Sequence, residues 1–283
     1  MNYRHAFHAG NFADVIKHVA LVAILLHLRR KDKPFCVIDT HAGSGSYDLR
    51  GDEAMRTGEA AQGVGRLGNR PDQPQLPEAL KTYLDCVQGE GEGVYPGSAL
   101  IAARLLRPQD RLIAIERHPE VARALRASLA GLANVRVAEA DGYERLFALI
   151  PPSERRGVIL IDPPYEADDE FARIADVLDR AHRRFATGIY LLWYPIKSRG
   201  AADAFVGEVV ARGIAPLSRL EIDVGRAPDG NGERLSAAGL LIANPPYGFD
   251  GEIREIAAIL APRLGQPGQG PATLTLVSQS ASR

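Results

Sequence analysis

The chain of 283 residues has only two cysteines, Cys36 and Cys86, and it lacks any apolar run long enough to cross a bilayer. Two cysteines cannot build a disulfide framework or a four-cysteine zinc site. The longest apolar run, residues 19–28, is interrupted by His27 and falls well short of the ~20 residues that a membrane span needs. The first ten residues lack the apolar core of a signal peptide. We therefore expect a cytoplasmic protein that makes no use of the membrane.

A strong charge of either sign is also missing, because the formal net charge is −1. Such a balance argues against broad, nonspecific binding to nucleic acid. The first 34 residues differ from the rest, since they hold six basic residues against two acidic ones. The six are Arg4, Lys17, Arg29, Arg30, Lys31 and Lys33. The simplest interpretation is a solvated, basic helix end, and any contact with nucleic acid would have to use a local patch.

Beyond Pro34, short apolar segments rich in β-formers alternate with segments of helical length. Strands are predicted at residues 35–39, 112–116, 135–138, 158–161, 189–193, 219–224 and 238–243. Unbroken apolar strands between helices indicate a mainly parallel sheet that is covered on both faces. A turn-rich link joins the last two strands and predicts an antiparallel hairpin at the sheet edge. We therefore predict an α/β fold with a seven-stranded sheet, which is the architecture of class I, Rossmann-like methyltransferases.

Residues 49–97 break this alternation, because they hold no strand candidate and include a helix-like segment at 76–87. We expect a small inserted helical subdomain here. The main domain then comprises residues 1–48 and 98–264, and it opens with a strong helix. The tail, residues 265–283, is rich in Gly, Gln, Pro and Ser and is expected to be flexible, although residues 274–277 could dock as a strand.

Small residues follow the first predicted strand, where Asp39-Thr-His-Ala-Gly-Ser-Gly45 forms a turn that a ligand can approach closely. The third glycine of G-x-G-x-x-G is absent, which disfavours a nicotinamide cofactor. Glu116 ends the second strand, where a carboxylate can accept hydrogen bonds from both hydroxyls of a ribose. Asp141 ends the third, where a carboxylate can bind an adenine amino group. Acids at successive strand ends favour one shared nucleoside site over separate helix caps.

Asp162-Pro163-Pro164-Tyr165 follows the fourth strand. Two prolines fix the backbone and remove two donors, so the carbonyls of a rigid turn face outward. A carboxylate and a proline carbonyl that accept from an aromatic amine make its nitrogen a better nucleophile, and Asp162 can accept the released proton. Tyr165 can stack on an extruded base. The turn therefore favours methylation of an exocyclic amine over a purely structural turn.

A second copy of this turn, Asn244-Pro-Pro-Tyr247, follows the last predicted strand. Its place after the edge hairpin predicts a position far from Gly43 and Gly45, and hence a structural role. The alternative is a glutamine-N5 methyltransferase that acts through Asn244.

Several motifs together resemble one family. They are residues 1–18 (MNYRHAFHAGNFADVIKH), Asp39–Gly45, Tyr95-Pro-Gly-Ser98, Asp162-Pro-Pro-Tyr-Glu166 and Asn244-Pro-Pro-Tyr247. The chain up to its tail is similar to the RlmJ family of bacterial 23S ribosomal RNA adenine-N6 methyltransferases. The family often has Trp where this chain has Tyr247.

The resemblance implies a set of site residues. Contacts to S-adenosylmethionine are implied for His18, His41, Ser98, Glu116, Asp141, Gly142 and Asp162, with Asp162 as proton acceptor. Contacts to the RNA or the target adenine are implied for Tyr3, His5 and Lys17, beside the stacking expected of Tyr165.

The expected function is N6-methylation of an adenine in 23S rRNA, flipped into the Asp162 turn, with S-adenosylhomocysteine as the product and a monomer as the favoured state. No metal is expected, because His5 and His8 have an H-x-x-H spacing without a convergent carboxylate or cysteine. Two alternatives stay open, a DNA adenine-N6 methyltransferase and a non-catalytic RNA-binding protein with the same fold.

Overall fold

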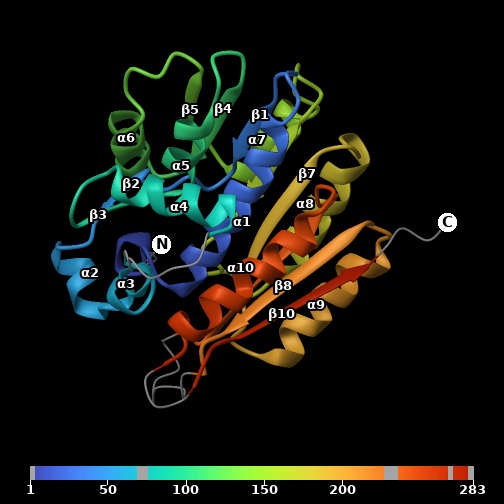
Figure 1. The fold of residues 1–283 in the computed structure, drawn as a ribbon. Helices are drawn as coiled ribbons and strands as arrows, with labels where there is room; N and C mark the ends of the chain where they lie inside the picture. Colours follow the sequence, from blue (N-terminus) through green and yellow to red (C-terminus); the bar gives the residue numbers. More distant parts are fainter. Residues whose placement is uncertain (1–3, 69–75, 226–234, 267–269, 280–283) are drawn as a thin grey trace.

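One large sheet organises the chain (Figure 1). The computed structural model describes residues 4–68, 76–225, 235–266 and 270–279. Its eight-stranded sheet has the order β10-β8-β9-β7-β6-β1-β4-β5. The strands are β1 (Cys36–Asp39), β4 (Arg111–Glu116), β5 (Val135–Glu139), β6 (Gly157–Ile161), β7 (Ile189–Pro195), β8 (Leu217–Asp223), β9 (Ala237–Ala243) and β10 (Thr273–Gln279). Neighbours from β5 to β7 are parallel, whereas β9, β8 and β10 pair antiparallel.

Helices cover both faces of the sheet because the strands are apolar on both sides. Along β1, Val37 packs into one core cluster while Cys36 and Ile38 pack into the other. The first cluster includes side chains of α1 (Phe12–Arg29), α4 (Glu78–Gln88), α5 (Ser98–Leu105), α6 (Pro119–Ser128) and α10 (Phe249–Leu264). The second includes side chains of α7 (Gly142–Leu149), α8 (Glu170–Arg184) and α9 (Arg199–Ala211). The predicted three-layer α/β architecture is confirmed.

Helix α1 runs through the centre of the molecule and is buried along most of its length (Figure 1). Asn11 caps its first turn by accepting from the backbone N–H groups of Ala13 and Asp14. The short 3₁₀ helix η1 (His5–Phe7) precedes it. Polar residues in the first turns of such a buried helix must find partners inside the protein.

Between β1 and β4 the chain leaves the main sheet. It forms β2 (Ser46–Asp48), α2 (Asp52–Thr57), α3 (Glu59–Gln62), η2 (Val64–Leu67), α4 and β3 (Val94–Pro96). We call residues 46–96 the excursion, and its first and last elements, β2 and β3, pair antiparallel. The sequence predicted neither β2 nor β3, because a three-residue strand is too short to show an alternating pattern. Residues 69–75, which follow η2, lie outside the described part of the chain.

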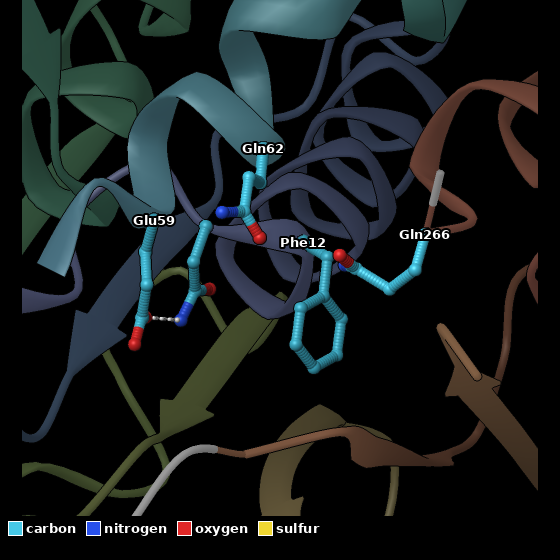
Figure 2. Close-up of a pocket in the computed structure, with 5 residues that line it drawn as sticks. Phe12, Glu59, Gln62 and Gln266 are labelled. Atoms are coloured by element: carbon cyan, nitrogen blue, oxygen red, sulfur yellow. Dashed lines mark hydrogen bonds between the residues drawn. The ribbon is translucent and has the colours of Figure 1, made fainter. Parts of the chain in front are cut away.

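Glu59 and Gln62 of α3 meet the start of α1 at a small hollow. The hollow is lined by Asn11, Phe12, Glu59, Gln62 and Gln266, and Figure 2 shows the hydrogen bond from Asn11 Nδ2 to Glu59 Oε2 (3.0 Å). The backbone N–H of Val64 also donates to the carbonyl of Gly10 (2.8 Å). The excursion is therefore joined to the segment that precedes α1.

The sheet has one strand more than the seven predicted. Residues 273–279, within the tail that was expected to be flexible, form β10 and pair antiparallel with all of β8. The edge is therefore β10, and β8 lies inside the sheet rather than at its margin. The alternation of Thr and Leu at 273–276 suits a strand with one packed face, since Leu274 and Leu276 contact the core while Thr273 and Thr275 are exposed. Most of the link between β8 and β9, at 226–234, lies outside the described residues.

In the described part of the chain, no helix is both long enough and apolar enough to span a bilayer.

Candidate functional site

Four carboxylates lie at the carboxyl ends of neighbouring parallel strands. The neighbouring strands β5, β4, β1 and β6 run parallel, so their carboxyl ends lie side by side. Asp39 and Glu116 are the last residues of β1 and β4, Asp141 lies two residues beyond β5, and Asp162 directly follows β6. The grouping that the sequence predicted is present.

The turn after β1 is tied to its neighbours through two acids. Asp39 is buried and accepts from Ser98 Oγ (2.6 Å) and from the backbone N–H of His41 (3.3 Å). Burial raises the pKa of Asp39 to about 6. Gly43, at φ +62°, donates its N–H to Glu116 Oε2 (3.1 Å). Ser98 and Glu116 are thus directly joined to the turn from 39 to 45.

Asp141 caps α7 by accepting from the N–H groups of Tyr143 and Glu144. Its other oxygen lies 3.5 Å from Arg173 and 3.6 Å from Arg117. Although its partial burial opposes ionisation, these donors hold the pKa of Asp141 below its usual range. The carboxylate is therefore charged and points along the same edge as Glu116.

His41 and Gly142 lie against Thr40. The Nδ1 atom of His41 is 2.8 Å from Thr40 Oγ1, and its ring meets Tyr143 edge-on at 5.0 Å. Burial lowers the pKa of His41 to about 4, so the imidazole is neutral near pH 7. A side chain at Gly142 would collide with the carbonyl of Thr40, so the backbones of these two turns are in contact.

Lys17 joins the helix α1 to the turn that follows β6. Its ammonium lies 2.8 Å from Asp14 Oδ1 and forms an ion pair with Asp162 Oδ2. Although burial alone would lower it, the two carboxylates raise the pKa of Lys17 above its usual range. His5 Nε2 and the N–H of Gly10 also contact Asp14, at 3.0 and 2.9 Å. The opening segment and the turn after β6 therefore share one buried charge network.

Lys17 was expected to meet the RNA or the target adenine, and its exposed fraction is only 4%. A charge so enclosed cannot be presented to a phosphate on the surface in this structure. It contacts Asp162 instead.

His18 is fully enclosed beneath this network. Its Nδ1 atom lies 2.7 Å from the hydroxyl of Tyr95, which lies 3.1 Å from that of Tyr83. Burial lowers the pKa of His18 to about 3, so the ring is neutral. Its Nε2 atom has no hydrogen-bond partner among the described residues.

Tyr165 takes a positive φ of 52° in the Pro-Pro turn. Its hydroxyl donates to the carbonyl of Trp193 (2.6 Å), and its ring lies 5.2 Å from Phe171 and 5.5 Å from Trp193. These contacts fix the aromatic ring beside Asp162.

The second turn, at Asn244, lies at the amino ends of the parallel strands, opposite the four carboxylates. Strand β9 pairs antiparallel with β7, so its carboxyl end meets the amino end of the parallel strands. The Nδ2 atom of Asn244 donates to the carbonyls of Ala186 (2.7 Å) and Gly188 (2.8 Å). The turn lies far from Gly43 and Gly45, as its position in the sequence predicted, and it binds the loop that precedes β7.

Sequence analysis missed the roles of Asp14 and Tyr95. An acid in the first turn of a helix is ordinary, because it suits the helix dipole. Asp14 is nevertheless the buried partner of Lys17 and His5. Its i,i+3 spacing to Lys17 inside an otherwise apolar helix was the available signal. Tyr3 lies outside the described residues, so its contact with the RNA or the target adenine stays a prediction. Across the described ranges, no three His, Cys, Asp or Glu side chains are grouped so that they could hold a metal ion.

A sheet with the order β5-β4-β1-β6-β7-β9-β8, extended by β10, and acids at four adjacent strand ends defines the class I, Rossmann-like methyltransferase fold. The family model described as "Ribosomal RNA large subunit methyltransferase D, RlmJ" matches residues 32–277. The chain belongs to this family.

Relatives of known sequence or structure align with this chain over nearly their whole length. The "Ribosomal RNA large subunit methyltransferase J" proteins of Escherichia coli and Haemophilus influenzae are 39% and 38% identical to this chain, over 98% of it and 99% of their own length. A Legionella pneumophila crystal structure superposes with a TM-score of 0.87 at 33% identity, over 96% of this chain and 99% of that one. A "probable spermidine synthase" of Corynebacterium glutamicum shares the fold alone, with a TM-score of 0.52 and 13% identity. The superposition covers 97% of this chain and 78% of that one.

Proposed function

We propose that this protein methylates the N6 amino group of an adenine in 23S ribosomal RNA, with S-adenosylmethionine as the methyl donor. Membership of a family of large-subunit rRNA methyltransferases and the Asp162-Pro163-Pro164-Tyr165 turn at the cofactor edge support this proposal. The observation that carries it is the placement of Asp162 beside Asp39, Glu116 and Asp141 on adjacent strand ends.

The residues at this edge fit the donor's adenosyl group. Glu116 is oriented by the N–H groups of Gly43 and His118 (3.1 and 2.8 Å), and its remaining lone pairs suit the hydroxyls of a ribose. Asp141 is charged and can accept from an adenine amino group. The unpartnered Nε2 of buried His18 is a polar atom that a ligand group would satisfy. These contacts support the assignment of Glu116, Asp141 and His18 to the cofactor site. We assign His41, Ser98, Gly142 and Asp162 to it as well, because the family resemblance implies them and they lie at or next to the turns that follow β1, β5 and β6.

The bound cofactor supplies an electrophilic methyl group on a sulfonium sulfur. Lys17 engages Oδ2 of Asp162, and no described residue donates to Oδ1, so that oxygen is left to accept an N–H of the target amine. A carbonyl of the Pro-Pro turn is suited to accept the second N–H, which raises the nucleophilicity of the nitrogen. The amine nitrogen would displace the sulfur from the methyl carbon, which leaves S-adenosylhomocysteine as a neutral thioether, and Asp162 would take the proton that the amine releases.

The target base needs a surface beside Asp162, because a paired adenine cannot reach the turn without leaving its stack. Tyr165 is held by its bond to Trp193 and by Phe171, so it is a rigid aromatic neighbour for a flipped base. We assign Tyr165 to the base. We propose the same for Lys17, which contacts Asp162, for His5, which shares Asp14 with Lys17, and for Tyr3, which lies outside the described residues.

Transfer of labelled methyl groups to a 23S rRNA transcript tests the function, with duplex DNA of matched adenine content as the comparison. We expect N6-methyladenine at one position of the RNA by mass spectrometry and none in the DNA. Asp162→Asn should lower the rate by about 10²–10⁴-fold, since an amide cannot accept the proton. Labelling of DNA alone, or an unchanged rate for Asp162→Asn, would refute the proposal.

A further inference from the structure

A cluster of cations lies at the other end of α1, away from the site. We call it the basic cluster, and it comprises Arg29, Arg30, Lys31, Lys33, Arg107 and Arg156. Three segments of the chain contribute to it, the end of α1 with the turn that follows, the loop before β4 and the residue before β6. The acids within it are Asp32, which is fully exposed, and Asp110, which is buried against Arg107. Glu252 of α10 is a further acid close enough to interact electrostatically with Arg30, although the two form no ion pair.

Two of these arginines hold the turn in place. Arg107 donates to the carbonyls of Arg29 (3.4 Å), Lys31 (2.9 Å) and Lys33 (3.0 Å). Arg156 donates to the carbonyls of Leu28 (2.5 Å) and Lys33 (3.0 Å). The carbonyl groups at the end of α1 are thus satisfied by side chains from elsewhere in the chain.

The remaining four cations have no such structural task. Arg29, Arg30, Lys31 and Lys33 are exposed, and none of them forms an ion pair with a described carboxylate. Basic residues at a helix end are commonly explained by capping or the helix dipole. Here Arg107 and Arg156 already bind those carbonyls, so capping does not account for four further charges on an ordered turn.

We infer that the basic cluster is a second contact surface for the RNA, which binds the phosphate backbone of the substrate at a distance from the target adenine. This inference rests on the proposed function. A row of cations without carboxylate partners, on a chain whose net charge is −1, is complementary to the repeated charges of a phosphate backbone.

The helix α1 sets the distance between the two surfaces. Lys17 contacts Asp162 near the start of the helix, and Arg29 is its last residue. Twelve residues at 1.5 Å each separate them by about 18 Å along the axis. RNA has to run over the surface, because α1 is buried along most of its length. At roughly 3.4 Å of rise per nucleotide, an RNA strand must therefore extend at least about five nucleotides beyond the target to reach the basic cluster.

The test compares two variants that lose the same charge. One is R29Q/R30Q/K31Q/K33Q, and the matched control is R123Q/R126Q/R136Q/R180Q, which removes four exposed arginines from α6, β5 and α8. Both are first checked for wild-type circular dichroism and thermal midpoint. The Kd for a 23S rRNA fragment is then measured by fluorescence anisotropy over a range of salt concentrations.

We expect the cluster variant to bind the long fragment about tenfold more weakly, with a salt slope lower by about 3, as the loss of four contacts to single-stranded phosphates predicts. The control should keep the wild-type slope. RNAs that extend fewer than about five nucleotides on either side of the target should not distinguish the cluster variant from the wild type.

The two proposals fail in different ways. A wild-type protein that leaves 23S rRNA unmethylated would overturn the proposed function and this inference with it. A wild-type protein that methylates the RNA, beside a cluster variant with unchanged Kd and salt slope, would overturn the inference alone. An equal loss in the control, or a loss of binding to phosphatidylserine vesicles without a loss for RNA, would overturn it as well.

Discussion

Lys17 forms an ion pair with Asp162, although 145 residues separate the two in the sequence. The same ammonium lies 2.8 Å from Asp14, so one cation joins the N-terminal helix to the proposed catalytic turn. Because Asp14 is almost fully buried, this cation is one of the groups that compensate its charge inside the protein.

Replacing Lys17 tests this network. Lys17→Met should lower the free energy of unfolding by about 3–5 kcal/mol, since it leaves buried Asp14 without one of its charged partners. Urea unfolding at neutral pH measures the loss. The double variant D14N/K17M removes the stranded charge as well, so we expect it to recover part of the stability. A single variant as stable as the wild type would contradict the account.

The second Pro-Pro turn permits a sharp comparison with the first. Asn244 has a positive φ of 55° and donates two hydrogen bonds through Nδ2. Asn244→Ala should cost about 2–3 kcal/mol, because it loses both bonds and places an alanine in the left-handed region. Asn244→Gly loses the bonds without the conformational penalty and should be less destabilised.

Methyl transfer separates this structural role from a catalytic one. Per folded molecule, both Asn244 variants should transfer methyl groups to 23S rRNA at the wild-type rate. Loss of transfer in Asn244→Gly with a retained rate in Asp162→Asn would instead favour catalysis by the second turn.

The sequence predicted the large sheet well because its strands are apolar and lie between helices. It missed β2 and β3, which have three residues each. It gave β10 only as a possibility, since β10 has one packed face with alternating exposure. For the site, strand ends were predictable because parallel strands bring their carboxyl ends to one edge. The contact of Lys17 with Asp162 was not, since no local pattern specifies which side chain of a buried helix faces a turn 145 residues away.

Acid should weaken the fold through His18. Burial lowers the pKa of His18 to about 3, whereas the unfolded chain takes up a proton near pH 6.5. The unfolded state therefore binds more protons between these values, and stability falls as the pH falls, by up to about 1.4 kcal/mol per pH unit from this group.

The comparison with His18→Gln isolates this contribution, because glutamine does not titrate and can still reach the hydroxyl of Tyr95. The charged and titratable groups that interact electrostatically with His18 are Asp14, Lys17 and His5. Unfolding free energies of both proteins are measured from pH 7 to pH 4. We expect the wild type to lose stability more steeply than the variant, and parallel curves would show that His18 is not held neutral by burial.

Gly63 tests how the excursion between β1 and β4 supports the site. It lies against the backbone of Gly10 and Asn11, and a side chain at this position would collide with the carbonyl of Gly10. The following residue, Val64, donates to that same carbonyl, and Asn11 caps the helix that carries Lys17. Gly63→Ala should therefore displace the start of α1 and cost about 1–3 kcal/mol.

The matched control is Gly68→Ala, since no described residue lies within 4 Å of its added carbon. Displacement of α1 would move Lys17 relative to Asp162, so methyl transfer should fall in Gly63→Ala even at temperatures where the protein stays folded. Single-turnover rates at saturating RNA measure this effect apart from binding. If Gly63→Ala loses stability but keeps its wild-type rate, the excursion supports the fold and not the geometry of the catalytic turn.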